Sequence, residues 1–140
     1  MAVEEEATVR AFLGHFECDE WDSARVERAV SRMASDARYQ IFAWDDPIVG
    51  HDAIRAELLR QAPLLRDVRI EILTIGSVGQ IVFTERRDSM ILRGKPVTSH
   101  IAGVFEVDAD GKIAAWREYL DSRELAVQLA ADDSGAGTND

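Results

Sequence analysis

Residues 81–92 read Ile-Val-Phe-Thr-Glu-Arg-Arg-Asp-Ser-Met-Ile-Leu, a run that is typical of a long β-strand. Side chains alternate between the two faces of a strand, so residues two apart share a face. One face carries the even-numbered residues, namely Val82, Thr84, Arg86, Asp88, Met90 and Leu92. Because apolar residues stand on both sides of Arg86 and Asp88, this face resembles a buried polar site.

Alternation alone does not decide which face is buried. Arg86 and Asp88 could instead form exposed cross-strand ion pairs, each contributing roughly 0.2–1 kcal/mol, or a buried ion-pair network without chemistry. A later run, residues 113–120, places Glu118 between Trp116 and Leu120 on one face. A buried, ionised carboxylate there needs a cation or several donors, and Arg86 is the candidate cation.

The strand at 81–92 belongs to a larger predicted sheet. From residue 66 to about residue 120, apolar and polar residues alternate in four long runs. Short turn sequences at 77–79, 93–96 and 108–111 separate these runs and suit connections between antiparallel neighbours. The second half of the chain is therefore predicted to be a four-stranded antiparallel meander.

The first half has helical periodicity. Two sets of apolar residues repeat at i, i+3, i+4 and i+7: Val9, Phe12, Leu13 and Phe16, then Val26, Ala29, Val30 and Met33. They predict two amphipathic helices, the second capped by Asp22 or Ser23. A short strand is expected at 38–42, and a third helix at about 52–62, ended by Pro63.

A last helix is predicted from Asp121 to about Ala131, with Glu124 completing a capping box. Helices followed by an antiparallel sheet predict an α+β fold, in which the N-terminal helices cover a curved sheet and leave a cone-shaped pocket. We expect a single domain over residues 1–131. Residues 132–140 contain no large apolar side chain and are expected to form a disordered acidic tail.

Composition narrows the function. The chain has 140 residues, with 16 Lys plus Arg against 26 Asp plus Glu, a formal charge of −10 that disfavours nucleic acid and anionic membrane surfaces as partners. Its one cysteine, its acidic N-terminus and the lack of a membrane-length apolar run favour a cytoplasmic location. The three histidines are scattered, so we expect no metal site and no cofactor.

Four stretches carry a family resemblance: Glu85-Arg86-Arg87-Asp88, Ile101 to Val107, Gly111-Lys112-Ile113, and Trp116-Arg117-Glu118-Tyr119-Leu120-Asp121. Together they resemble the limonene-1,2-epoxide hydrolase family. The resemblance covers most of the chain and implies the curved α+β cone shared with nuclear transport factor, ketosteroid isomerase and small polyketide cyclases. Because fold alone does not give function, the site residues must be compared one by one.

The family's site has an Arg-x-Asp on one strand, an aspartate in Trp-Arg-Asp-Tyr on the last strand, and a tyrosine two residues before an asparagine. Arg86 and Asp88 match the first motif, and Tyr39 and Trp116 match their counterparts. Two positions depart from the pattern. Glu118 stands in place of the second aspartate, and Ile41 stands in place of the asparagine.

The resemblance and the residues together suggest one-step hydrolysis of an epoxide on a small apolar molecule. Glu118 would act as general base on water, Tyr39 would orient that water, and Asp88 would be the general acid. Arg86 would bridge the two acids. The expected substrate-binding wall is Ile41, Met90, Leu92, Ser99, Ile101 and Trp116.

Two other functions stay open. The changes at Ile41 and Glu118 fit a non-catalytic module that binds a small ligand or a partner. An isomerase or cyclase acting on a polycyclic ketone would use one carboxylate to move a proton. The outer sheet face, with Val104, Ala115 and Tyr119, is apolar enough to pair with another sheet, and the resemblance also implies a homodimer.

Overall fold

The computed structural model describes the backbone of residues 2–138 and the side chains of residues 3–130. The elements, in chain order, are α1 (Ala2–Gly14), α2 (Ser23–Ser31), β1 (Met33–Gln40), β2 (Ile48–Val49), α3 (His51–Gln61), the 3₁₀ turn η1 (Ala62–Leu64), β3 (Leu65–Val78), β4 (Ile81–Leu92), β5 (Lys95–Val107), β6 (Ile113–Leu120) and α4 (Ser122–Thr138). This order confirms the predicted α+β class.

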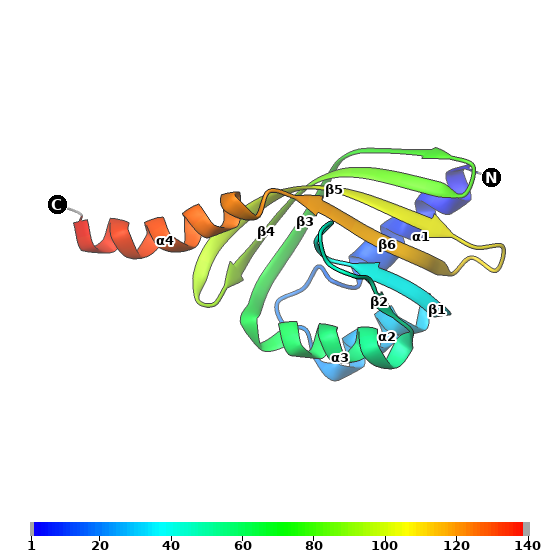
Figure 1. The fold of residues 1–140 in the computed structure, drawn as a ribbon, viewed down its shortest axis with the longest axis horizontal. Coiled ribbons are helices and arrows are strands. Elements are labelled where there is room, and N and C mark those ends of the chain that lie inside the picture. Colours follow the sequence, from blue (N-terminus) through cyan, green and yellow to red (C-terminus); the bar gives the residue numbers. More distant parts are fainter. Residues whose placement is uncertain (1, 139–140) are drawn as a thin grey trace.

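One six-stranded sheet, in the order β2-β1-β6-β5-β4-β3, forms the frame of the molecule. Strands β3 to β6 are antiparallel neighbours, which confirms the predicted meander. Residues with positive φ occupy the two tighter turns, Gly79 between β3 and β4, and Arg93 with Gly94 between β4 and β5. The long strands curve, and α1 crosses one face of the sheet while α2 and α3 lie beside β1 (Figure 1).

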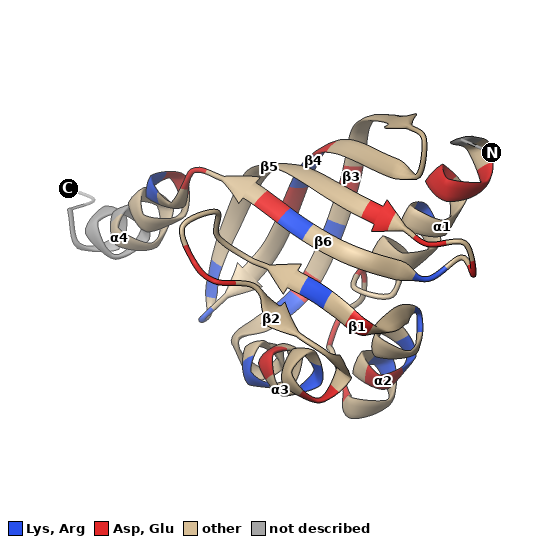
Figure 2. Cartoon of the chain, turned by 45° about the vertical axis from the view of Figure 1, so that its right-hand side comes forward, with Lys and Arg blue, Asp and Glu red and all other residues tan. Residues whose placement is uncertain are grey.

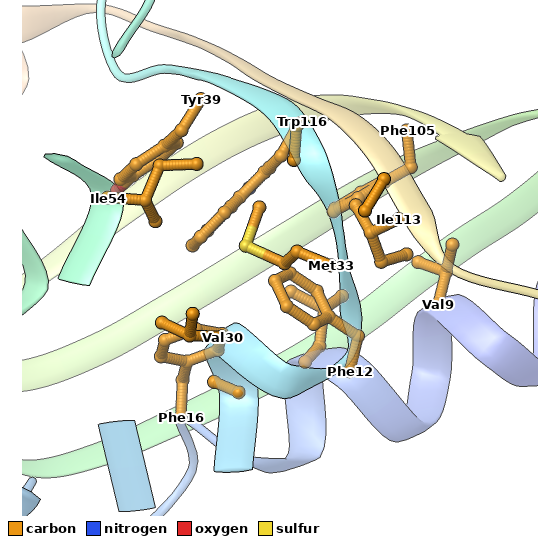
Figure 3. Close-up of a cluster of buried hydrophobic side chains, with 14 of the residues drawn as sticks. Val9, Phe12, Phe16, Val30, Met33, Tyr39, Ile54, Phe105, Ile113 and Trp116 are labelled. Atoms are coloured by element: carbon orange, nitrogen blue, oxygen red, sulfur yellow. The ribbon is translucent and has the colours of Figure 1, made fainter. Parts of the chain in front are cut away.

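The helices and the inner face of the sheet enclose an aromatic core. The Phe12 ring from α1 meets Trp116 of β6 edge to face at a centroid distance of 5.0 Å, and Phe16 lies 5.2 Å from the same indole. Tyr39 stacks on Trp116 at 4.0 Å. Figure 3 shows these rings together with Met33. Helix α1 therefore fixes the position of Trp116, which stands two residues before Glu118.

Three sequence predictions were wrong in detail. Met33 begins β1 instead of ending the second helix, because α2 stops at Ser31 and Met33 turns inward as the first buried residue of a strand. Strand β1 ends at Gln40, so Ile41 lies in the loop that follows. The sheet is also not purely antiparallel, because β1 pairs in parallel with β6.

The C-terminal helix departs from the predictions as well. Asp121 accepts a hydrogen bond from the Arg123 amide, but Glu124 accepts from the His100 amide on β5 and so forms no capping box. The backbone of α4 continues to Thr138, beyond the predicted end near Ala131. Residues 139–140 and the side chains after position 130 lie outside the described part, so the disordered tail stays a prediction.

Charged residues of both signs are spread over α2, α3 and the strands (Figure 2). Within residues 2–138, no helix combines the length and the apolar character that a membrane span requires.

Candidate active site

A cavity of about 190 Å³ opens between the inner face of the sheet and the ends of α1 and α3. All ten residues that the sequence singled out line it: Tyr39, Ile41, Arg86, Asp88, Met90, Leu92, Ser99, Ile101, Trp116 and Glu118. Further lining residues are Leu13, Phe16, Trp21, Phe42, Gln61, Leu65, Val68, Ile70, Leu120 and Leu125. The even-numbered face of β4 is thus the inner face, and the exposed ion-pair alternative is wrong.

Arg86 is the centre of the polar groups in this cavity. Arg86 is 2% exposed, although charged side chains are almost never fully buried unless they are paired. Nη2 donates to Glu118 Oε1 at 2.6 Å and Nη1 donates to Glu118 Oε2 at 3.1 Å. Nη2 also donates to Asp88 Oδ2 at 3.0 Å, and Nε donates to Asp88 Oδ1 at 3.3 Å. One guanidinium therefore holds both acids with forked hydrogen bonds.

Burial and charge act against each other on this cluster. Burial raises the pKa of Glu118, while the Arg86 guanidinium opposes that change by attraction and by hydrogen bonding. Burial disfavours the charge on Arg86, but Glu118 and Asp88 outweigh it and raise the pKa of the guanidinium, so Arg86 stays a cation. Glu118 is consequently a stronger base than a carboxylate in water.

Glycine 103 makes room for this cluster. It pairs with Thr84 on one side and with Glu118 on the other, in one row across β4, β5 and β6. A Cβ atom at this position would lie 2.6 Å from Arg86 Nη1 and 2.9 Å from Glu118 Oε2. Its φ is not positive, so the need for glycine here is steric. Sequence reasoning missed this role.

Tyr39 is buried beside the acids rather than bound to them. Burial raises the pKa of its hydroxyl, the Gln61 side chain opposes that change, and the Glu118 charge adds to it. Gln61 Nε2 donates to Glu57 Oε2 at 2.8 Å, which fixes the amide at the end of α3. Sequence reasoning missed Gln61 because one polar residue at the end of a helix gives no periodic signal.

The cluster can exchange protons with a bound molecule, because two carboxyl groups share one cation in an otherwise apolar cavity. Among the residues that the structure describes, no three His, Cys, Asp or Glu side chains converge in the arrangement of a metal site.

Comparison with known proteins gives concordant matches. Residues 3–131 match the family described as the limonene-1,2-epoxide hydrolase catalytic domain. Over 82 residues the chain is 39% identical to "Epoxide hydrolase EphG" of Mycobacterium tuberculosis, an alignment that covers 55% of this chain and 54% of that protein. The match thus spans about half the length of that curated relative.

A solved structure described as that of an M. tuberculosis LEH-like epoxide hydrolase superposes with a TM-score of 0.79 at 26% sequence identity. The superposition covers 99% of this chain and 98% of the other, so the likeness extends over the whole fold.

Proposed function

Since this chain belongs to the limonene-1,2-epoxide hydrolase family, we propose that it hydrolyses an epoxide by direct attack of water. The observation that carries the proposal is the position of Arg86, whose Nη2 atom binds both Asp88 and Glu118 within one apolar cavity. When one cation holds two acids, one acid can act as proton donor and the other as proton acceptor.

In the proposed reaction, Glu118 removes a proton from water as the water oxygen bonds to an epoxide carbon. The ring C–O bond breaks, and its electron pair goes to the ring oxygen, which takes the proton of Asp88. The product is a diol, and one water is consumed. The pair starts with one proton, because two ionised carboxylates on one cation would leave a net charge in an apolar cavity.

Tyr39 is proposed to orient the water, and the side chains around it to exclude bulk solvent. Its ring stacks on Trp116, and the Gln61 side chain at the end of α3 acts on its hydroxyl by hydrogen bonding. The apolar lining, including Ile41, Met90 and Leu92, favours a small apolar substrate.

The test is turnover of a panel of epoxides, followed as diol formation, with Asp88→Asn and Glu118→Gln as variants. Each variant keeps the shape of the side chain and removes its proton chemistry. We expect the wild type to form diol and each variant to lose at least about 100-fold in kcat, the typical contribution of a general acid or base. Retained activity in both variants would overturn the mechanism.

One observation favours a second function, a ligand-binding module. Both oxygens of Glu118 accept hydrogen bonds from Arg86, and apolar Ile41 lies where the family has a polar amide. Tight binding of apolar molecules without diol formation would support this alternative. Movement of an enone double bond would instead support an isomerase.

We also propose that the protein is a cytoplasmic homodimer. Leu73, Phe83 and Tyr119 on the outer sheet face are 41%, 45% and 42% exposed, large values for apolar side chains. Pairing of two such faces would cover them. A monomeric mass at micromolar concentration in light scattering would overturn the dimer.

A further inference from the structure

Ser99 is a buried hydroxyl that the proposed mechanism does not yet use. The residue is 2% exposed, and among the described residues its Oγ has no hydrogen-bond partner. It lines the cavity from β5 and stands directly opposite Asp88 of β4 in the antiparallel ladder. Side chains that face each other in this way have Cβ atoms about 4.5–5.5 Å apart. Both groups can therefore reach one atom of a bound molecule.

A buried hydroxyl without a partner is unusual, because burial removes its hydrogen bonds to water without replacing them. Its neighbours on the inner face of β5, Val97 and Ile101, are apolar and offer no acceptor. Trp116 Nε1 is also buried and has no hydrogen-bond partner of good geometry. Its N–H nevertheless favours the ionised form of the Glu118 carboxyl group and so lowers the pKa of that group. The Ser99 hydroxyl has no hydrogen-bond partner among the described residues, so we expect its partner to arrive with the ligand.

We propose that the Ser99 hydroxyl donates a hydrogen bond to the oxygen of the epoxide, beside the proton of Asp88. This inference rests on the proposed hydrolysis and adds a catalytic residue to it. Ser99 keeps its own proton throughout. Asp88 transfers its proton to the ring oxygen as the C–O bond breaks, and Ser99 stabilises the negative charge that builds on that oxygen during the step.

The order of the ladder supports this assignment. Asp88 pairs with Ser99, Arg86 pairs with Ile101, and Glu118 pairs with Gly103 further along β5. The proposed proton donor Asp88 and the hydrogen-bond donor Ser99 thus lie at one end of the cluster, and the proposed base Glu118 lies at the other, with the guanidinium between them. Water opens an epoxide by attacking the carbon from the side away from the departing oxygen. The base that activates the water and the groups that bind the departing oxygen must therefore lie at opposite ends of the site.

The experiment compares Ser99→Ala with Ser89→Ala in the full-length protein. Ser89 is on β4 with its side chain on the opposite face, where its Oγ contacts Thr98 Oγ1 at 3.3 Å. The two variants therefore lose the same atom from the same pair of strands. Diol formation gives kcat and KM, and thermal unfolding gives the midpoint Tm for each variant.

We expect Ser99→Ala to lower kcat about 100-fold, the scale reported for loss of one donor to a developing oxyanion, with KM changed less than about threefold. Its Tm should equal or exceed that of the wild type, because an unsatisfied buried hydroxyl is removed. Ser89→Ala should keep the wild-type kcat. A merely structural Ser99 would instead lower Tm and leave kcat unchanged.

An unchanged kcat in Ser99→Ala, beside a wild type that forms diol, would overturn the Ser99 assignment alone. A wild type that forms no diol from any epoxide would overturn the assignment together with the proposed function.

Discussion

The guanidinium of Arg86 on β4 donates two hydrogen bonds to the carboxylate of Glu118 on β6, at 2.6 and 3.1 Å, across the intervening strand β5. The pair forms above Gly103, whose missing side chain leaves the space. This relationship is the basis of the proposed chemistry, because it holds Glu118 of β6 within reach of a molecule that is bound to Asp88 of β4.

Replacement of Arg86 by lysine is expected to reduce activity by at least about 100-fold. Lysine keeps the charge, but its single ammonium group cannot present a planar fork to two carboxylates, and misplacement of reacting groups by ~1 Å costs on that order. Arg87→Lys is the matched control, since Arg87 makes an exposed pair with Glu71. Equal turnover by the two variants would contradict the role given to Arg86.

Arg86→Met is expected to lower the free energy of unfolding by about 3–5 kcal/mol, because it leaves two buried carboxyl groups without their cation. Urea unfolding measures this quantity. The loss should be smaller at low pH, where both carboxyl groups take up protons. A pH-independent loss would show that packing alone, without charge, explains the effect.

Gly103→Ala is expected to lower both activity and stability, the latter by about 1–3 kcal/mol, as is typical of overpacking. The new methyl group would displace Arg86, Glu118 or Thr84, each of which has an atom within 2.9 Å of its position. Gly76→Ala in β3 is the control, because a Cβ there meets no atom within 4 Å. If both glycine variants behave like the wild type, the steric account of position 103 is wrong.

The pH dependence follows from the environment of Glu118. Burial raises the pKa of this carboxyl above its ordinary value of 4.5, and the proposed base must be ionised. The acid limb of kcat/KM should therefore lie above pH 4.5. A raised pKa in the folded state also means that the stability from this group is greatest at low pH and declines as pH rises from 4.5 through the folded-state pKa. An acid limb at or below pH 4.5 would contradict Glu118 as the base.

Helix α4 is expected to control access to the cavity. Beyond the end of β6, Gln128 accepts from the Thr98 amide at 2.8 Å and donates to the Thr98 carbonyl at 2.7 Å, as a neighbouring strand would. Leu125 of the same helix lines the cavity. Gln128→Leu should speed hydrogen exchange at the Thr98 amide and raise KM. Unchanged exchange at Thr98 would show that α4 is held by other contacts.

The sequence predicted the meander because local alternation fixes which side chains share a face, although alternation alone left open which face is buried. Apolar residues on both sides of Arg86 and Asp88 indicated a buried site, and the cavity brings both residues together with Glu118. Helical spacing identified α1, and Phe12 of this helix and Phe16 just beyond its end pack on Trp116. These features depend on residues close together in the chain.

Features that depend on distant residues were missed. Met33 fits the helical spacing of α2, but its strand pairs with β6, about eighty positions later in the chain. Glu124 has the spacing of a capping residue, yet it finds the free His100 amide on β5. Gln61 and the steric role of Gly103 likewise became visible only when α3, β4 and β6 were placed together.

A single turnover in ¹⁸O-labelled water tests the central claim most directly. With enzyme in excess over epoxide, attack of water on the epoxide itself places the heavy oxygen in the diol on the first turnover, and Glu118 and Asp88 keep their oxygens. We expect full labelling of that first diol. An unlabelled first diol, with the heavy oxygen appearing only after repeated turnover, would mean that a carboxylate attacks the epoxide, and it would contradict the account.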